Sequence, residues 1–201
     1  AWITVLNSLF SEAEHPLSIS SSASKPERLT FTIKELGDFT RKIKTLQPGL
    51  KVFIDGPFGH FSVDRHTHAE QFMFIAGGVG ITPIMSMLRT LADRGDRRPL
   101  ILLYANKDWE GVTFREELER LEDSLNLRVV HVLERPAPGW EGEQGFINRE
   151  MLKRYLPESA RRNLVEIFIC GPQPMMNAVE KSLADLGVPF GDVHSERFNL
   201  V

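Results

Sequence analysis

The sequence predicts an α/β protein in which a β-rich region, residues 1–65, precedes a parallel-sheet region, residues 66–201. In the second region, short apolar runs alternate with amphipathic segments of helical period. This alternation is typical of a parallel sheet covered by helices on both faces. In the first region short strand patterns prevail, and the polar stretch 60–70, which has no clear period, separates the two regions.

Composition narrows the classes of function. With 42% hydrophobic and 25% charged residues, the 201-residue chain has enough apolar mass for a core. A net charge of −3 gives no basic surface for nucleic acid. The single Cys170 has no disulfide partner in the chain and excludes a cysteine cluster for metal, which fits a reducing compartment.

The β-rich region contains four strand candidates, at residues 2–6, 17–20, 29–33 and 52–54. Residues 29–33 alternate apolar and polar side chains, as in a half-buried strand. One short helix is expected after Gly37, capped by Asp38, and a turn at 56–59 closes the region. The chain starts directly on a strand pattern without an initiator Met, so we expect it to be a fragment of a longer protein. Its apolar runs fall short of the ~20 residues that span a bilayer, and it shows no signal-peptide pattern.

Five strands are expected in the second region, at residues 72–76, 99–104, 127–133, 165–169 and 192–194. Thr82 is the expected cap of the first intervening helix, with Pro83 at its first position. Thr113 and Glu116 form the pattern of a capping box for the next one. Later helices are expected from Asn148 and from Pro172.

The chain is organised around the stretch FMFIAGGVGITPIM, residues 72–85. A buried strand, a glycine turn at 77–80 and a helix start follow one another there. This order builds an anion site, because free N–H groups and the positive end of the helix dipole point over the turn. We interpret it as a pyrophosphate-binding turn, while a purely structural turn remains open.

Other residues carry weaker signals. Cys170 lies at the expected carboxyl end of a strand, the edge where open α/β sheets bind ligands, and a buried small hydrophobic role is equally open. No neighbouring His makes Cys170 a nucleophile. Asp64, His66 and His68 suggest metal by composition, but a solvated loop is the favoured interpretation and no metal site is expected. The Met pairs 85/87 and 175/176 are expected in helix cores.

Four segments together resemble the ferredoxin–NADP reductase superfamily, and more closely its ferric reductase and NADPH oxidase branch. They are residues 15–18 (HPLS), 33–40, 77–83, and 170–172 with 196–198. This family binds FAD in an N-terminal antiparallel β-barrel and NAD(P)H in a C-terminal Rossmann-like domain. The resemblance therefore implies an incomplete FAD-binding barrel in residues 1–65 and an NAD(P)-binding five-stranded domain in residues 66–201.

The resemblance also implies a flavin site, position by position. Ser18 would hydrogen-bond near the flavin N5, which receives the hydride, and Phe198 would stack on the isoalloxazine. The other flavin-binding residues implied are His15, Pro16, Leu17, Ile33, Lys34, Gly37, Phe39 and Thr40.

For the nicotinamide cofactor, the resemblance places Cys170 and Glu196 beside the nicotinamide, where they join Ser18 and Phe198 as catalytic residues. Lys107 suits a 2′-phosphate and favours NADPH, whereas Asp108 favours NADH, so NADPH is the preferred cofactor and NADH stays the alternative. The full set of residues that the resemblance implies for the nicotinamide cofactor is Gly78, Gly80, Ile81, Thr82, Pro83, Asn106, Lys107, Cys170, Gly171, Pro172 and Met175.

The function implied is a reductase in which NAD(P)H passes hydride to FAD and single electrons leave for an acceptor outside the chain. In the resembled branch that acceptor is haem in a membrane domain of the parent protein, at the cytoplasmic face, with ferric iron reduction as one output. Two alternatives remain open. One is a soluble reductase component of an oxygenase. The other is a non-catalytic nucleotide-binding regulatory subunit, because Leu17 replaces an aromatic residue of the family pattern and upstream barrel strands are missing.

Overall fold

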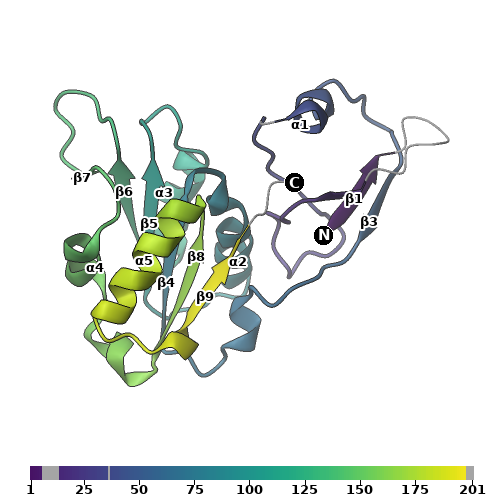
Figure 1. Cartoon of the computed structure of the whole chain (residues 1–201). Helices are drawn as coiled ribbons and strands as arrows, with labels where there is room; N and C mark the ends of the chain where they lie inside the picture. Colours follow the sequence, from purple (N-terminus) through teal and green to yellow (C-terminus); the bar gives the residue numbers. More distant parts are fainter. Residues whose placement is uncertain (6–13, 36, 198–201) are drawn as a thin grey trace.

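The computed structural model describes residues 1–5, 14–35 and 37–197, and its main feature is a six-stranded parallel sheet in the order β7-β6-β5-β4-β8-β9 (Figure 1). The strands are β4 (Gln71–Gly77), β5 (Leu100–Asn106), β6 (Leu127–Leu133), β7 (Glu143–Gln144), β8 (Val165–Cys170) and β9 (Val193–Glu196). The predicted parallel sheet is confirmed, and β7 extends it by a sixth strand. Two polar residues after a Pro- and Gly-rich loop carry no apolar period, so β7 had no sequence signal.

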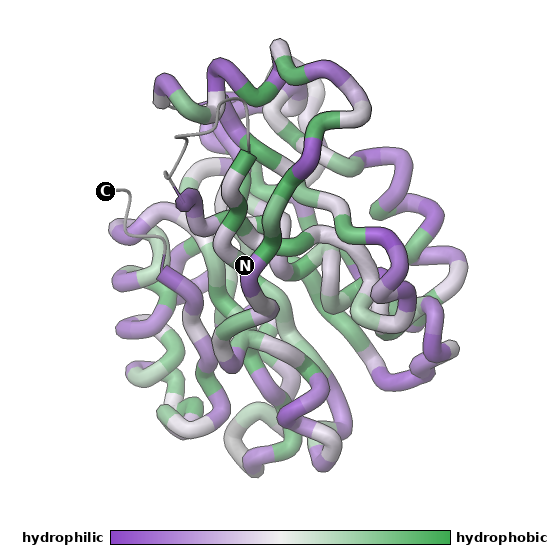
Figure 2. The backbone as a smooth tube through the Cα atoms, turned by 90° about the vertical axis from the view of Figure 1, so that its right-hand side faces the viewer, coloured by the Kyte–Doolittle hydropathy of each residue, from purple (hydrophilic) through white to green (hydrophobic). Residues whose placement is uncertain are grey.

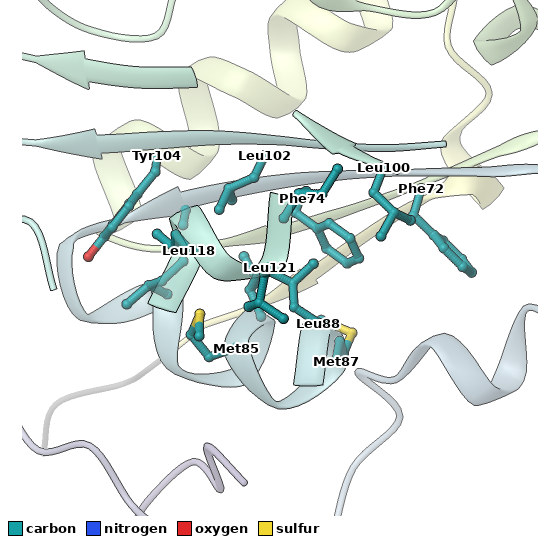
Figure 3. Close-up of a cluster of buried hydrophobic side chains, with 14 of the residues drawn as sticks. Phe72, Phe74, Met85, Met87, Leu88, Leu100, Leu102, Tyr104, Leu118 and Leu121 are labelled. Carbon is teal, nitrogen blue, oxygen red and sulfur yellow. The ribbon is translucent and has the colours of Figure 1, made fainter. Parts of the chain in front are cut away.

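Helices cover both faces of this sheet. Phe72 and Phe74 of β4 point to one face, where they pack with α2 (Ile81–Asp93) and α3 (Arg115–Ser124). Figure 3 shows these rings directed toward side chains of the two helices. On the other face, Met73 and Ile75 pack with α4 (Arg149–Tyr155) and α5 (Gln173–Asp185). The whole strand is therefore buried, as its unbroken apolar run indicated. In the side view of Figure 2 hydrophobic segments run through the interior and hydrophilic ones through outer loops.

A small antiparallel sheet forms the first region, with strand order β2-β1-β3. Its strands are β1 (Trp2–Val5), β2 (His15–Pro16) and β3 (Val52–Asp55), and the helix α1 (Asp38–Ile43) lies between β2 and β3 in the chain. The side chains of β3 are all exposed, Phe53 by 59%. This sheet therefore has one strand, β3, that lacks a covering layer within the described residues.

The predicted strands at 17–20 and 29–33 are wrong, because the structure keeps a single bridge there, between Ile19 and Phe31. Beyond the bridge, backbone groups of this segment form hydrogen bonds with helix α2. Ser20 still donates its backbone N–H to the Thr30 carbonyl (2.8 Å), but the Ser21 carbonyl accepts from the Ser86 hydroxyl of α2 (2.6 Å). Hydrogen bonds to a helix replace the ladder that alternation alone predicted.

Residues 20–23 join the small-sheet region to α2 through further contacts. The Ala23 N–H donates to Thr90 Oγ1 (2.9 Å), and Arg89 donates to the Ser20 carbonyl. The same guanidinium makes two bonds to the Glu117 carboxylate of α3, at 2.6 and 2.7 Å. We call this contact of residues 20–23 with α2 the serine seam. It fixes the two regions against each other (Figure 1).

Two predicted helix caps are wrong, Thr82 at the start of α2 and Thr113 at the start of α3. Thr82 is the second residue of α2 and donates its hydroxyl to the Val79 carbonyl (2.8 Å), because a 3₁₀ turn, η2 (Gly78–Gly80), leads directly into the helix. Thr113 lies outside α3, since Phe114 adopts a left-handed φ of 64° before the helix begins at Arg115. Both predictions failed because the backbone just before each helix, the 3₁₀ turn η2 and the left-handed Phe114, sets the first helical residue.

The other two caps differ in outcome. Asn148 caps α4 as predicted, with its side-chain oxygen accepting from the Met151 N–H (3.0 Å). Asp38 is wrong as a cap, because it is the first residue of α1 and Gly37 occupies the cap position. The remaining 3₁₀ turns are η1 (Val63–Arg65), η3 (Glu158–Arg162) and η4 (Phe190–Asp192). None of the helices in the described part of the chain has the length and apolar character needed to span a bilayer.

Candidate nucleotide and flavin site

The glycine turn between β4 and α2 leaves backbone open at one residue. Gly78 has a φ of +53°, and a Cβ built there would meet nothing within 4 Å. The Gly78 carbonyl accepts from the Tyr104 hydroxyl (3.3 Å), which in turn accepts from the Thr113 N–H (3.3 Å). Tyr104 thus supports the turn from β5, a role that its place at a strand end did not reveal. Side chains of Ile81, Thr82 and Pro83 are buried, so only their backbone can face a ligand.

Neighbouring glycines of the turn serve packing. A Cβ on Gly80 would lie 2.2 Å from the Cys170 carbonyl oxygen, and one on Gly77 would lie 2.7 Å from Met175 Sδ. A Cβ on Gly171 would meet Met175 Cε at 2.7 Å. The ends of β4 and β8 therefore interlock without room for side chains. The structural and the ligand-binding interpretations of this motif apply to different glycines: Gly77 and Gly80 pack, while Gly78 stays open.

Cys170 and Glu196 lie in register at the carboxyl ends of β8 and β9, beside Ala76 of β4. Burial raises the pKa of the Cys170 thiol, and the negative charge of Glu196 adds to this. The thiol is therefore neutral at physiological pH and cannot act as a thiolate nucleophile. Burial also raises the pKa of Glu196. The structure thus confirms that these two residues are neighbours, as a common site requires.

Residues 15–18, the first segment that the resemblance assigns to the flavin site, are linked to this sheet edge through Ala1. The Leu17 N–H donates to the Ala1 carbonyl (2.9 Å), and the Ala1 amino group donates to the Leu17 carbonyl (3.0 Å). The Glu196 charge acts on that same amino group, opposing the lowering of its pKa by burial. Ala1 thus connects Leu17 to Glu196, and Glu196 pairs with Cys170. Through Ala1, the segment at 15–18 therefore comes within the electrostatic reach of the carboxyl end of β9.

His15 is stacked on a residue of the second flavin segment. Its ring lies against Phe39 of α1, with centroids 3.3 Å apart and planes 14° from parallel. At the start of α1 the Gly37 N–H donates to Thr40 Oγ1 (2.9 Å). The structure therefore brings segments 15–18 and 37–40 together. Among the other residues predicted for the flavin site, Pro16 and Lys34 are exposed and Ser18 and Ile33 are half-buried. Phe198 lies outside the described residues.

Asn106 and Lys107 extend the carboxyl edge at β5. The Asn106 carbonyl accepts from the Glu134 N–H (3.0 Å) and the Lys107 carbonyl from the Arg135 N–H (2.7 Å). The Asn106 side-chain nitrogen Nδ2 is buried and makes no hydrogen bond of ordinary length among the described residues, although its amide acts electrostatically on the Tyr104 hydroxyl. An unpaired buried donor at this edge is the group a bound ligand would satisfy. Asp108 is engaged elsewhere, accepting from the Gly111 N–H (2.9 Å).

An aromatic cluster that sequence reasoning missed adjoins these residues. Trp109 lies edge-on to His131 of β6 (centroids 5.0 Å apart) and tilted to Trp140 (5.4 Å). The Arg115 guanidinium lies over the Trp109 ring in a cation–π contact, 5.3 Å from its centroid. Burial lowers the pKa of His131, and Arg115 lowers it further. Trp109 follows β5 and His131 lies inside β6, so only the folded chain places them together.

The segment 64–68, interpreted as a solvated loop, is largely engaged, so that interpretation is wrong. Asp64 pairs with Arg94, the residue directly after α2. His66 is only 15% exposed and lies beside Glu166 of β8, with His68 next to it. Partners far away in sequence hold the segment, and the pattern of residues 64–68 itself does not show them.

A doubly covered parallel sheet with an open glycine turn at its carboxyl edge defines a dinucleotide-binding domain of Rossmann-like type. The family model for the oxidoreductase NAD-binding domain matches residues 74–181, more than half of the chain. The chain belongs to this family, within the ferredoxin–NADP reductase superfamily, as its motifs predicted.

Relatives and solved structures agree with this assignment. Over 187 residues the chain is 32% identical to the stachydrine N-demethylase reductase subunit Stc4 of Rhizobium meliloti, covering 90% of this chain and 52% of that protein. It is 32% identical to NADH-cytochrome b5 reductase 2 of Phaeosphaeria nodorum, covering 86% and 53%. The chain therefore spans about half the length of these curated relatives.

Among solved structures, the cytochrome b5 reductase domain of Ulva prolifera nitrate reductase superposes with a TM-score of 0.79 at 24% identity, covering 97% of this chain and 82% of that one. At this identity the match supports the fold. The ferric reductase branch remains a prediction from the sequence.

Proposed function

We propose that this chain is the nucleotide-binding part and a portion of the flavin-binding part of an NAD(P)H-dependent flavoprotein reductase. Residues 66–201 would hold the nicotinamide cofactor and residues 1–65 would contribute to the FAD site. The observation that carries this proposal is the edge at which Cys170 and Glu196 lie in register, with Ala1, which is hydrogen-bonded to Leu17, within the electrostatic reach of Glu196. A hydride donor and acceptor must lie in contact, and this edge joins the two regions.

The residues present fit a dinucleotide. The open backbone at Gly78 accommodates a pyrophosphate, because a side chain there would occupy the space that the structure leaves free. The unpaired Nδ2 of Asn106 offers a hydrogen bond to the ribose or base at the same edge. The neutral Cys170 thiol and Glu196 would border the nicotinamide and exclude water from it.

The residues present also fit part of a flavin site. The half-buried Ser18 can donate a hydrogen bond, and the His15–Phe39 stack offers a flat aromatic wall next to it. Gly37 leaves space where a Cβ would meet nothing within 4 Å. FAD, when bound, supplies the change from two-electron to one-electron transfer. Ile33, Lys34 and Phe198 stay assigned to this site by the family pattern.

NADH is the donor that we propose. The name of the Phaeosphaeria nodorum relative specifies NADH, and this chain shares 32% identity with it. Lys107, which favoured NADPH in the sequence, is exposed and lies beside the exposed Arg135. Lys107→Ala tests whether Lys107 contributes to NADPH binding. In that case kcat/KM for NADPH should fall, while kcat/KM for NADH should stay within about twofold of the wild type.

The acceptor that we propose is a haem protein of the cytochrome b5 kind, since relatives are named as cytochrome b5 reductases. A second candidate, an oxygenase component, is favoured by the name of the N-demethylase reductase subunit. Ferric iron and a haem-containing membrane domain of a longer parent protein remain proposals from the resemblance, as does a place at the cytoplasmic face of a membrane.

The decisive experiment follows flavin absorbance in the FAD-loaded full-length protein under anaerobic conditions. We expect NADH to bleach the flavin, and Ser18→Ala to slow this step at least about tenfold through loss of a hydrogen bond to the reacting region. Ser182→Ala is the matched control, because its hydroxyl donates to Ala178 within α5 (2.8 Å). An unchanged rate in Ser18→Ala would overturn the assignment of Ser18. Absence of bleaching by either nucleotide would overturn the reductase proposal. Cytochrome b5, ferric citrate and oxygen, added separately, then identify the acceptor.

A further inference from the structure

A cluster of three histidines and two carboxylates lies away from the nucleotide edge. His66 Nδ1 is 3.2 Å from Glu166 Oε1, and His194 Nε2 is 2.5 Å from Glu166 Oε2. The ligand atoms of these three residues all lie within 4.8 Å of one another. They come from three separate elements: the segment after η1, the start of β8 and the strand β9.

A fourth donor lies on the solvent side of this group. His68 Nε2 is 2.8 Å from Glu166 Oε1, and its side chain is 64% exposed, against 4% for Glu166. Because the His68 imidazole is exposed, a metal ion could reach the cluster from its side, while His66, His194 and Glu166 are the more buried donors. Phe168 backs that wall, with its ring 5.5 Å from that of His66 and 5.0 Å from that of His194. The donors are thus held on an apolar support.

A buried carboxylate next to the cluster lacks a partner. Asp192 is 8% exposed, and its Oδ2 has no hydrogen-bond partner among the described residues. Asp192 ends η4, two residues before His194 of β9. A buried carboxylate without a hydrogen-bond partner is costly unless a positive charge lies close to it.

We propose that His66, His194 and Glu166, with His68 as the fourth ligand, bind one zinc ion. Zinc prefers four ligands in a tetrahedron, with Zn–N bonds of about 2.0–2.1 Å, which separates neighbouring donor atoms by about 3.4 Å. Three donors, from His66, Glu166 and His194, lie within 4.8 Å of one another, and His68 Nε2 lies 2.8 Å from Glu166 Oε1, so side-chain rotations would have to bring the four donors to this spacing when the ion binds. Imidazole donors suit zinc, copper, iron and nickel. Among these, zinc takes histidine and carboxylate ligands in a four-coordinate tetrahedron.

The position of the site assigns it a structural role. Glu166 lies four residues before Cys170 on β8, so the metal would be about 13 Å from the nucleotide edge at ~3.3 Å per residue. Zinc would not take part in hydride transfer. It would bind the edge strand β9 and the segment 66–68 to β8, and β9 carries Glu196 two residues beyond His194. This inference is independent of the proposed function.

The test uses chelator-treated full-length protein, titrated with Zn²⁺ by calorimetry and with Co²⁺ by visible absorption. We expect one metal ion per chain, the absorption bands of tetrahedral Co²⁺, and a Tm raised by several degrees because the metal binds the folded state. His66→Gln and His194→Gln should each weaken zinc binding by more than the 10- to 100-fold typical of a lost second-shell partner.

His60→Gln is the matched control, because His60 is exposed and lies in the same segment of the chain. It should retain wild-type affinity and the full Tm shift. NADH reduction of the flavin should be equal with and without zinc. Wild-type protein that binds no zinc, or variants at His66 and His194 that bind it as tightly as the control, would overturn the proposal. Because binding and Tm are measured without turnover, the result does not depend on the reductase activity.

Discussion

Replacing Gly80 with alanine tests the interlock of β4 and β8. Ordinary contact for the added Cβ begins at 3.4 Å, but it would lie 2.2 Å from the Cys170 carbonyl oxygen and 2.5 Å from its carbon. The two must therefore separate by about 1.2 Å, the difference between 3.4 and 2.2 Å. The obstacle is backbone at the end of a fully buried strand, so no side-chain rotation can relieve it.

Two opposing effects set the size of the loss. Gly80 has φ −61° and ψ −10°, a helical conformation in which alanine ordinarily stabilises by about 0.4–1 kcal/mol. Overpacking against rigid backbone costs about 3 kcal/mol, the upper end of the usual range. We therefore expect a net loss of about 2 kcal/mol in the free energy of unfolding, which lowers Tm by about 4–8 °C for a chain of this size.

Urea denaturation and scanning calorimetry measure this loss directly. Gly191→Ala is the control, because a Cβ there meets nothing within 4 Å and no left-handed φ opposes it. Its stability should stay within about 0.5 kcal/mol of the wild type. If Gly80→Ala proved as stable as wild type, the packing role of Gly80 would be refuted, and only a ligand-binding role would remain for it.

Three further predictions concern other contacts. Tyr104→Phe removes the hydroxyl that supports the Gly78 carbonyl, so the free energy of unfolding should fall by about 1 kcal/mol and the KM for NADH should rise; an unchanged KM would separate Tyr104 from the turn. Arg89→Met breaks its bonds to Ser20 and to α3, and we expect urea melts to show a loss of about 2–3 kcal/mol, with no loss if the serine seam is dispensable. Cys170 should resist iodoacetamide at pH 8 in the folded protein. Its pKa is raised above the unfolded value of about 8.5, so its contribution to stability is complete below that pH and declines above it; a Cys170→Ala variant should lose this decline.

The architecture of the main sheet was predictable because it depends on local pattern. Each long apolar run became a buried strand, and the helices followed at the expected spacing. The polar strand β7 was not predictable, since its pairing with β6 is set by the neighbouring strand and not by its own side chains. The Thr82 cap failed for a related reason, because η2 leads into the helix two residues earlier, so that Gly80 occupies the cap position.

The candidate sites divide in the same way. The glycine turn and Cys170 were found because residue type and position coincide within a few residues. The histidine cluster was missed because His66 and Glu166 are 100 residues apart in sequence, and only the pairing of β8 with β9 brings His194 to them. One signal was present: Glu166 is a charged residue inside an otherwise apolar strand, and a buried carboxylate requires a partner.

The serine seam has a consequence for engineering. Helix α2 carries the nucleotide turn at its first end and holds residues 20–23 along its length through Ser86, Arg89 and Thr90. A chimaera joined near residue 65 would transplant the sheet but replace one side of this contact with foreign side chains. Donor domains exchanged between reductases therefore need residues 20–23 to travel with α2, so that the unit of exchange is discontinuous in sequence.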